Sequence, residues 1–158
     1  MAIAIRQATV ADAGAIADLV ARNDPRDLVS EISREERYER FRECLSEGLN
    51  VSFLAESDGN VVGELSIALR HPDPSEIGFG VHPEWRRQGI ATQLVRHAIA
   101  WADEHDVHKL TAQVMSHNTA AIGVLERAGF SEEGYLVNQF RRKDGGTSDA
   151  VLLARVAA

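Results

Sequence analysis

The sequence lacks the features that are typical of secreted and membrane proteins. It contains one cysteine, Cys44, which excludes an intrachain disulfide and is typical of a cytoplasmic protein. No apolar run approaches the roughly 20 residues of a membrane-spanning helix. Residues 1–6 resemble the start of a strand and lack the layout of a secretion signal. We therefore expect a cytoplasmic protein without a membrane partner.

Several catalytic and binding motifs are also missing. The sequence has no G-x-S-x-G nucleophile motif, no G-x-x-x-x-G-K-[ST] phosphate loop, and no His or Cys set with metal-ligand spacing. The formal net charge is −7, whereas general nucleic-acid binding needs a basic face. These absences predict no resident metal, no nucleic-acid partner and no covalent intermediate on a side chain.

The hydrophobic pattern predicts one domain over residues 1–158 with an α+β fold. Strands are expected at residues 3–9, 50–56, 61–69, 76–81, 109–115, 130–141 and 150–156, and helices at residues 12–22, 33–47, 88–105 and 118–128. Three consecutive strands require antiparallel pairing, and a strand–helix–strand crossover ending at residue 115 requires one parallel pair. The fold class is therefore a mixed, mostly antiparallel sheet flanked by helices.

The segment between residues 77 and 92 is the most informative part of the chain. An apolar strand runs into a proline turn, two arginines, a glutamine and Gly89, and a long amphipathic helix follows. The first N–H groups of a helix lack intrahelical partners and carry the positive end of the helix dipole. Glycine allows close approach to that main chain, so the segment predicts a phosphate or pyrophosphate site. The alternative is a polar turn before an ordinary helix.

Two motifs carry a resemblance to a known family. Arg86-x-x-Gly89-x-Ala91 matches the pattern R/Q-x-x-G-x-G/A, and residues 118–130 are similar to N-x-x-A-x-x-x-Y-x-x-x-G-F, with Leu125 at the tyrosine position. Together they resemble the GNAT superfamily of acyl-CoA-dependent N-acyltransferases, and the resemblance extends over most of the chain. It implies a GNAT-like fold and acetyl-CoA as co-substrate.

The resemblance also implies which residues bind the cofactor. They are Phe79, Val81, Arg86, Arg87, Gln88, Gly89, Ile90, Ala91, Thr92, Asn118, Ala121 and Leu125. In the family, the pantetheine arm enters beside the strand at residues 76–81 and pairs with its main chain. Gly78 and Gly80 leave one face of that strand bare, although they are also compatible with sheet curvature alone. Asn118 is expected to cap its helix, which is compatible with a place beside the cofactor.

Acetyl transfer to an amine needs a base and a group that protonates the departing thiolate. Glu76 is the candidate base, acting through water, and the alternative is a surface glutamate. Leu125 has no proton to give, which leaves three alternatives: an unassisted thiolate, no catalysis, or another donor. Of the nearby donors Ser116, His117 and Tyr135, the phenol of Tyr135 is preferred. We expect Leu125 to form an apolar wall of the thioester pocket.

The function implied by the resemblance is transfer of the acetyl group of acetyl-CoA to a primary amine. The acceptor is a small molecule such as an amino acid, or a peptide N-terminus, and residues 23–48 correspond to the part of the family that lines the acceptor site. The alternative is a weakly active or inactive sensor that binds acyl-CoA, which the leucine at position 125 keeps open. A homodimer is compatible with both.

Overall fold

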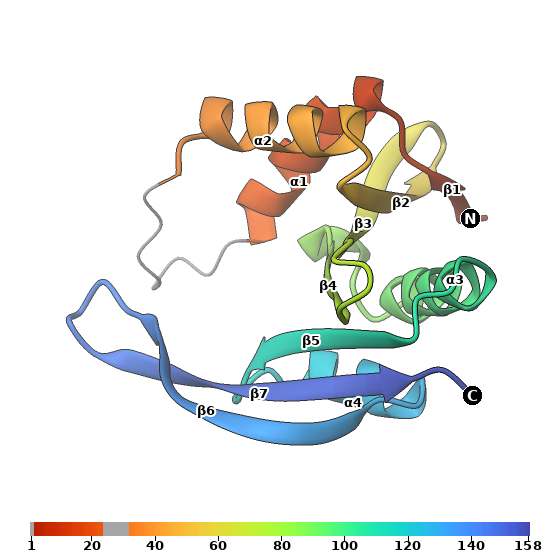
Figure 1. Ribbon diagram of the computed structural model, residues 1–158. Helices are drawn as coiled ribbons and strands as arrows, with labels where there is room; N and C mark the ends of the chain where they lie inside the picture. The colour runs from red at the N-terminus through yellow and green to blue at the C-terminus, as the bar shows by residue number, and fades with distance from the viewer. Residues whose placement is uncertain (1, 24–31) are drawn as a thin grey trace.

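The computed structural model describes residues 2–23 and 32–158, and its described strands form one sheet in the order β1-β2-β3-β4-β5-β7-β6 (Figure 1). The strands are β1 (Ala4–Gln7), β2 (Asn50–Ser57), β3 (Asn60–Ala68), β4 (Ser75–Val81), β5 (Lys109–Met115), β6 (Ser131–Arg141) and β7 (Thr147–Val156). The helices are α1 (Ala13–Asn23), α2 (Arg34–Ser46), α3 (Ile90–Glu104) and α4 (Thr119–Arg127), with short 3-10 helices at Val10–Asp12 and Pro83–Trp85. The order of helices and strands is the predicted one, and the predicted fold class is confirmed.

The sheet divides where β4 meets β5, its only parallel neighbours among the described strands. These strands pair at two positions, Ser75 with Leu110 and Glu76 with Thr111, and then diverge. All other neighbouring strands pair antiparallel. Figure 1 shows β1–β4 as one half of the sheet and β5, β7 and β6 as the other. After Glu76, the edge of β4 that faces β5 has no strand partner in the described part of the chain.

The two faces of β3 and β4 pack against different helices. On one face, Gly63, Leu65 and Ile67 are buried against α3, and a methyl group on Gly63 would lie 3.0 Å from Cγ2 of Ile90. Only glycine allows α3 to pack so close to the sheet. Because side chains alternate along a strand, Glu64 and Ser66 point to the opposite face, where α1 lies.

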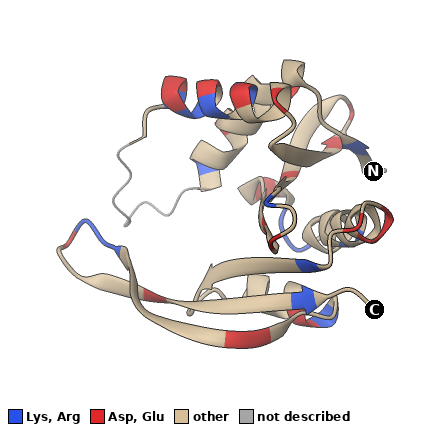
Figure 2. Ribbon diagram, viewed as in Figure 1, with Lys and Arg blue, Asp and Glu red and all other residues tan. Residues whose placement is uncertain are grey.

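Helix α2 is capped and charged as the sequence predicts. The Ser33 side chain accepts a hydrogen bond from the N–H of Glu36, and no residue of α2 is buried. Figure 2 shows charges of both signs along its surface. Arg34 joins α2 to α1 through an ion pair of 2.7 Å with Asp18. Most charged side chains of α2 are exposed, as expected, whereas Arg37 is half-buried.

Several predicted boundaries shift for local reasons. Helix α3 begins at Ile90 rather than residue 88, because Gly89 adopts a left-handed conformation with φ of 77° and ends the preceding turn. Strand β7 begins at Thr147 rather than residue 150, because its pairing with β6 extends to Arg141. Among the described residues, no helix has the length and apolar character needed to cross a membrane.

Candidate active site

A cavity of about 320 Å³ occupies the space where β4 and β5 diverge. Its walls come from β4, β5, the start of α4 and β6, and the lining residues are Ile77, Gly78, Phe79, Ala112, Gln113, Val114, Met115, Asn118, Ala121 and Phe140. Backbone of β4 that would otherwise bind a neighbouring strand therefore borders this cavity. An extended ligand with amide groups is suited to such an unpaired edge.

The segment between β4 and α3 has the backbone geometry of an anion site. Arg87 and Gly89 both adopt left-handed conformations, with φ of 63° and 77°. No atom of a described residue lies within 4 Å of the missing Cβ of Gly89, so a ligand can approach the main chain there. Ile90 is buried and has only its backbone to offer, whereas Ala91 and Thr92 are half-buried.

The two arginines of this segment have different surroundings. Arg86 is held by the protein itself: its Nη2 donates to Oδ1 of Asn23 over 2.6 Å and its Nε donates to the carbonyl of Val81 over 3.2 Å. It therefore braces the segment against α1 and β4. Arg87 and Gln88 are exposed beside the start of α3. Of the two arginines, Arg87 is the one placed to meet an anion in solvent.

The second motif lies at the other side of the β4/β5 cavity. The Oδ1 atom of Asn118 accepts a hydrogen bond of 3.2 Å from the N–H of Ala121, which confirms the predicted cap. Both residues line the cavity. Leu125 lies one turn further along α4, fully buried in the hydrophobic core, and lines neither cavity. The structure thus places Leu125 in the core behind the described lining of the pocket.

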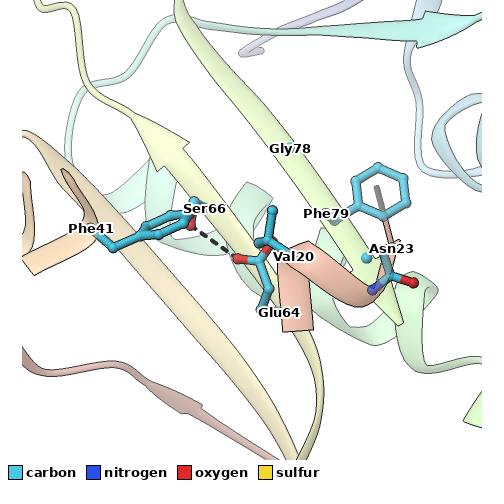
Figure 3. Close-up of a pocket in the computed structure, with 8 residues that line it drawn as sticks. Val20, Asn23, Phe41, Glu64, Ser66, Gly78 and Phe79 are labelled. Atoms are coloured by element: carbon cyan, nitrogen blue, oxygen red, sulfur yellow. Dashed lines mark hydrogen bonds between the residues drawn. The ribbon is translucent and has the colours of Figure 1, made fainter. Parts of the chain in front are cut away.

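A second cavity of about 310 Å³ lies on the other side of β4 (Figure 3). Helices α1 and α2 supply part of its lining and β3 and β4 the rest; the lining residues are Val20, Asn23, Phe41, Glu64, Ser66, Gly78, Phe79 and Gly80. Gly78 and Phe79 line both cavities, so the two meet at the middle of β4. Part of the segment predicted to line an acceptor site, residues 24–31, lies outside the described residues.

Glu64 is the ionisable residue in the described lining of this second cavity, and sequence reasoning missed it. Its side chain is 5% exposed and lies across the β3–β4 ladder from Gly80. Its Oε2 accepts a hydrogen bond of 3.0 Å from Ser66 Oγ, and Ser66 in turn bonds Ser52 (2.7 Å between the hydroxyl oxygens). Burial raises the pKa of Glu64 to about 7, and the Ser66 hydrogen bond partly opposes that rise. A glutamate inside an otherwise apolar strand was the available signal.

Neither predicted catalytic side chain lies in a cavity lining. Glu76 shares the sheet face of Glu64 but is 35% exposed, and its Oε2 lies 3.6 Å from Nη2 of Arg70. Tyr135 is 52% exposed on β6, where its hydroxyl donates to Oδ2 of Asp149 over 2.8 Å. Solvent exposure and tertiary contacts decide both positions, and local sequence does not reveal them. In the described part of the chain, no three His, Cys, Asp or Glu side chains are grouped to hold a metal.

Comparison with known proteins identifies the family and the relatives that this chain resembles. The family model described as acetyltransferase (GNAT) family matches residues 16–130. The chain is 32% identical over 104 residues to the L-amino acid N-acetyltransferase AaaT of Escherichia coli, covering 63% of this chain and 64% of that protein. It is 34% identical over 76 residues to the ribosomal protein bS18-alanine N-acetyltransferase of the same species, covering 48% and 51%. The chain thus spans about half to just under two thirds of the length of these curated relatives.

Solved structures are similar over nearly the whole chain. A ribosomal-protein-alanine N-acetyltransferase from Brucella melitensis has a TM-score of 0.84 at 27% identity, covering 98% of this chain and 99% of that one. The protein yncA from Salmonella typhimurium, solved with its cofactor acetyl-CoA, has a TM-score of 0.83 at 22% identity, covering 99% and 94%. At that identity the second comparison shows the shared fold alone.

Proposed function

This chain belongs to the acetyltransferase (GNAT) family, and we propose that it acts as one domain that transfers the acetyl group of acetyl-CoA to a primary amine. The observation that carries the proposal is the meeting of two cavities at Gly78 and Phe79. One cavity follows the open edge of β4, which suits a long acyl carrier. The other opens on the opposite side of β4, which suits a separate acceptor.

The residues around the first cavity fit coenzyme A. We place the pantetheine arm along the unpaired edge of β4 near Phe79, and the pyrophosphate at the start of α3. The backbone N–H groups there are oriented outward, the position of Gly89 is open, and Arg87 adds a positive charge at the surface. Arg86 then acts by bracing this segment through Asn23 and Val81. Asn118 and Ala121 border the arm on its other side.

The chemistry requires little from the protein beyond placement. The thioester of acetyl-CoA supplies an acyl group that is already activated. The chain holds the reacting groups together at β4, and a main-chain N–H near Phe79 polarises the carbonyl oxygen. The described lining of the β4/β5 cavity contains no phenol, imidazole or thiol. We therefore infer that no side chain of this lining protonates the departing thiolate, whose unperturbed pKa near 8.5 makes it a fair leaving group.

The acceptor is an amine of the kind that the relatives' names indicate, an amino acid or the N-terminal alanine of a protein. Such an amine enters from the cavity below α1 and α2. The sensor alternative gains no support from this geometry. Binding of acyl-CoA alone does not require a second cavity with a buried carboxyl group.

Thiol release from acetyl-CoA over a panel of amines tests the proposal. L-alanine, L-alaninamide and a peptide with N-terminal alanine form the panel, and a reaction without amine gives the background hydrolysis. We expect saturable, amine-dependent release of coenzyme A and an acetylated product of the expected mass. Saturable binding of acetyl-CoA without turnover of any amine would favour the sensor, and absence of binding would refute both.

A further inference from the structure

We propose that the Glu64 carboxyl is the group that binds the ammonium of the acceptor and takes its proton before acetyl transfer. This inference rests on the proposed acetyltransferase function and names the acceptor side of its site. It transfers the role of base from Glu76, on β4, to a residue of β3. The residues that carry it come from four separate elements around one cavity, α1, α2, β3 and β4.

The first support is the isolation of Glu64 within its cavity. The remaining described lining is apolar or neutral, and Asn23 already uses its side chain to bind the carbonyl of Leu19 and the guanidinium of Arg86. Among the described residues, Ser66 supplies the hydrogen bond to the Glu64 carboxyl, and no described cation forms an ion pair with it. A buried carboxylate without a counter-ion is costly. A cationic ligand in the cavity removes that cost.

The second support is the bare face of β4 beside the carboxyl. Glu64 and Ser66 lie directly across the ladder from Gly80 and Gly78. Among the described residues, no atom lies within 4 Å of the missing Cβ of Gly78, so none of them fills the space beside Ser66 where the two cavities meet. The corresponding space at Gly80 is occupied by Asn23, at 2.9 Å. An amine bound by Glu64 therefore has an open path toward Gly78.

The step balances without another reactant. The carboxylate of Glu64 takes one proton from the ammonium, which becomes a neutral amine with a free electron pair. That pair forms the C–N bond to the thioester carbonyl carbon, and the C–S bond breaks with its electrons on sulfur. The second nitrogen proton passes to the thiolate, directly or through water, which yields an amide and coenzyme A thiol. Glu64 then releases its proton to solvent, so one proton is produced for each transfer.

Glu76 lies on the same face of β4 as Gly78 and Gly80 but does not have the burial and cavity position of Glu64. Its side chain is 35% exposed, it lies near the guanidinium of Arg70, and it lines neither cavity. A carboxyl group so placed is accessible to solvent and already has a cationic side chain near it. The two residues lie on the same face of the sheet, so a substitution at each provides a direct comparison.

The test compares Glu64→Gln with Glu76→Gln and with Glu132→Gln, an exposed control on β6. Glutamine has the size of glutamate and can still accept the hydrogen bond from Ser66. We expect Glu64→Gln to lower kcat/KM by about 100-fold or more and to abolish the rise of rate through neutral pH, while the Kd for acetyl-CoA stays within about twofold. Ser66→Ala should move the rise in rate to higher pH, because it removes the hydrogen bond that lowers the pKa of Glu64.

A binding measurement keeps the inference testable even without turnover. With coenzyme A present, L-alaninamide should raise the Tm of the wild-type protein, and its hydroxyl analogue L-lactamide should not. Glu64→Gln should lose this response to the amine. The inference is overturned by an unchanged response, or by a Glu64→Gln enzyme that keeps its rate and pH profile, most clearly if Glu76→Gln loses them instead. Failure of the proposed function has a different signature: the wild type then neither binds acetyl-CoA nor acetylates any amine.

Discussion

Replacing Glu64 with glutamine should change how the free energy of unfolding depends on pH, independently of any activity. In the folded protein burial raises the pKa of Glu64 to about 7, whereas in the unfolded chain it has its ordinary value of 4.5. Between these two pH values the folded state holds a proton that the unfolded state has released. The stability that Glu64 contributes is therefore fully present below pH 4.5 and is lost as pH rises through 7.

The magnitude follows from the same two values. One pH unit corresponds to about 1.36 kcal/mol, so the difference between about 7 and 4.5 amounts to about 3 kcal/mol. The glutamine variant carries no charge and lacks this loss. As pH rises from acidic to alkaline, the wild type should therefore lose about 3 kcal/mol of unfolding free energy relative to Glu64→Gln. Such a loss at neutral pH is a large part of the stability of a typical small domain.

Urea unfolding at a series of pH values from about 4 to about 8.5 measures this difference, and the m-value shows whether the unfolding transition itself changes. Glu132→Gln, exposed on β6, serves as the control and should follow the wild-type pH dependence. If the curves of wild type and Glu64→Gln ran parallel over this range, the carboxyl would not be desolvated. Glu64 would then be neither a desolvated carboxyl nor a suitable base for the acceptor amine.

Three further predictions concern other parts of the site. Gly89→Leu should weaken acetyl-CoA binding by a factor of about ten or more, about 1.4 kcal/mol in calorimetry, and Gly145→Ala, also left-handed, should leave the affinity unchanged and so control for backbone strain. Leu125→Ala should cost about 2–5 kcal/mol of stability in urea unfolding and leave the shape of the pH–rate profile unchanged, because the side chain is fully buried behind the pocket; a changed profile would place it at the reacting groups. L-alaninamide should have a lower KM than L-alanine, because the described acceptor lining holds a carboxyl and no cation to pair with a second carboxylate, and equal KM values would contradict this.

The local features of the proposed cofactor site, a helix cap and a left-handed glycine, could be predicted from the sequence. Asn118 caps α4 and Gly89 stands before α3 because capping and left-handed turns depend on a few neighbouring residues. The order of strands and helices along the chain followed from hydrophobic periodicity. The Asp58-Gly59 pair indicates a hairpin, and both residues have positive φ as a tight hairpin requires. The family resemblance placed these features in one fold, and the family model over residues 16–130 agrees.

The acceptor side could not be found in the same way. Glu64 and Glu76 both lie in predicted strands. The sequence favours Glu76 as the base because Gly78 and Gly80 leave the face of the strand beside it bare. Their difference arises from what covers them: Val20 of α1 and Phe41 of α2 line the cavity of Glu64, whereas Glu76 meets solvent and Arg70. Tyr135 likewise depends on a partner, Asp149, across the β6–β7 ladder.

By itself, then, the sequence determined the order of the elements, the turns and caps, and the family, since each of these depends on residues within one or two turns or on recognisable motifs. Only the tertiary structure showed that the Glu64 carboxyl is desolvated and that the Tyr135 hydroxyl is hydrogen-bonded to Asp149. It also placed Leu125 in the core behind the pocket. The physical reason is that desolvation and access depend on atoms brought together from distant segments. The pKa of Glu64 rises because helices and strands from distant parts of the chain enclose its carboxyl group.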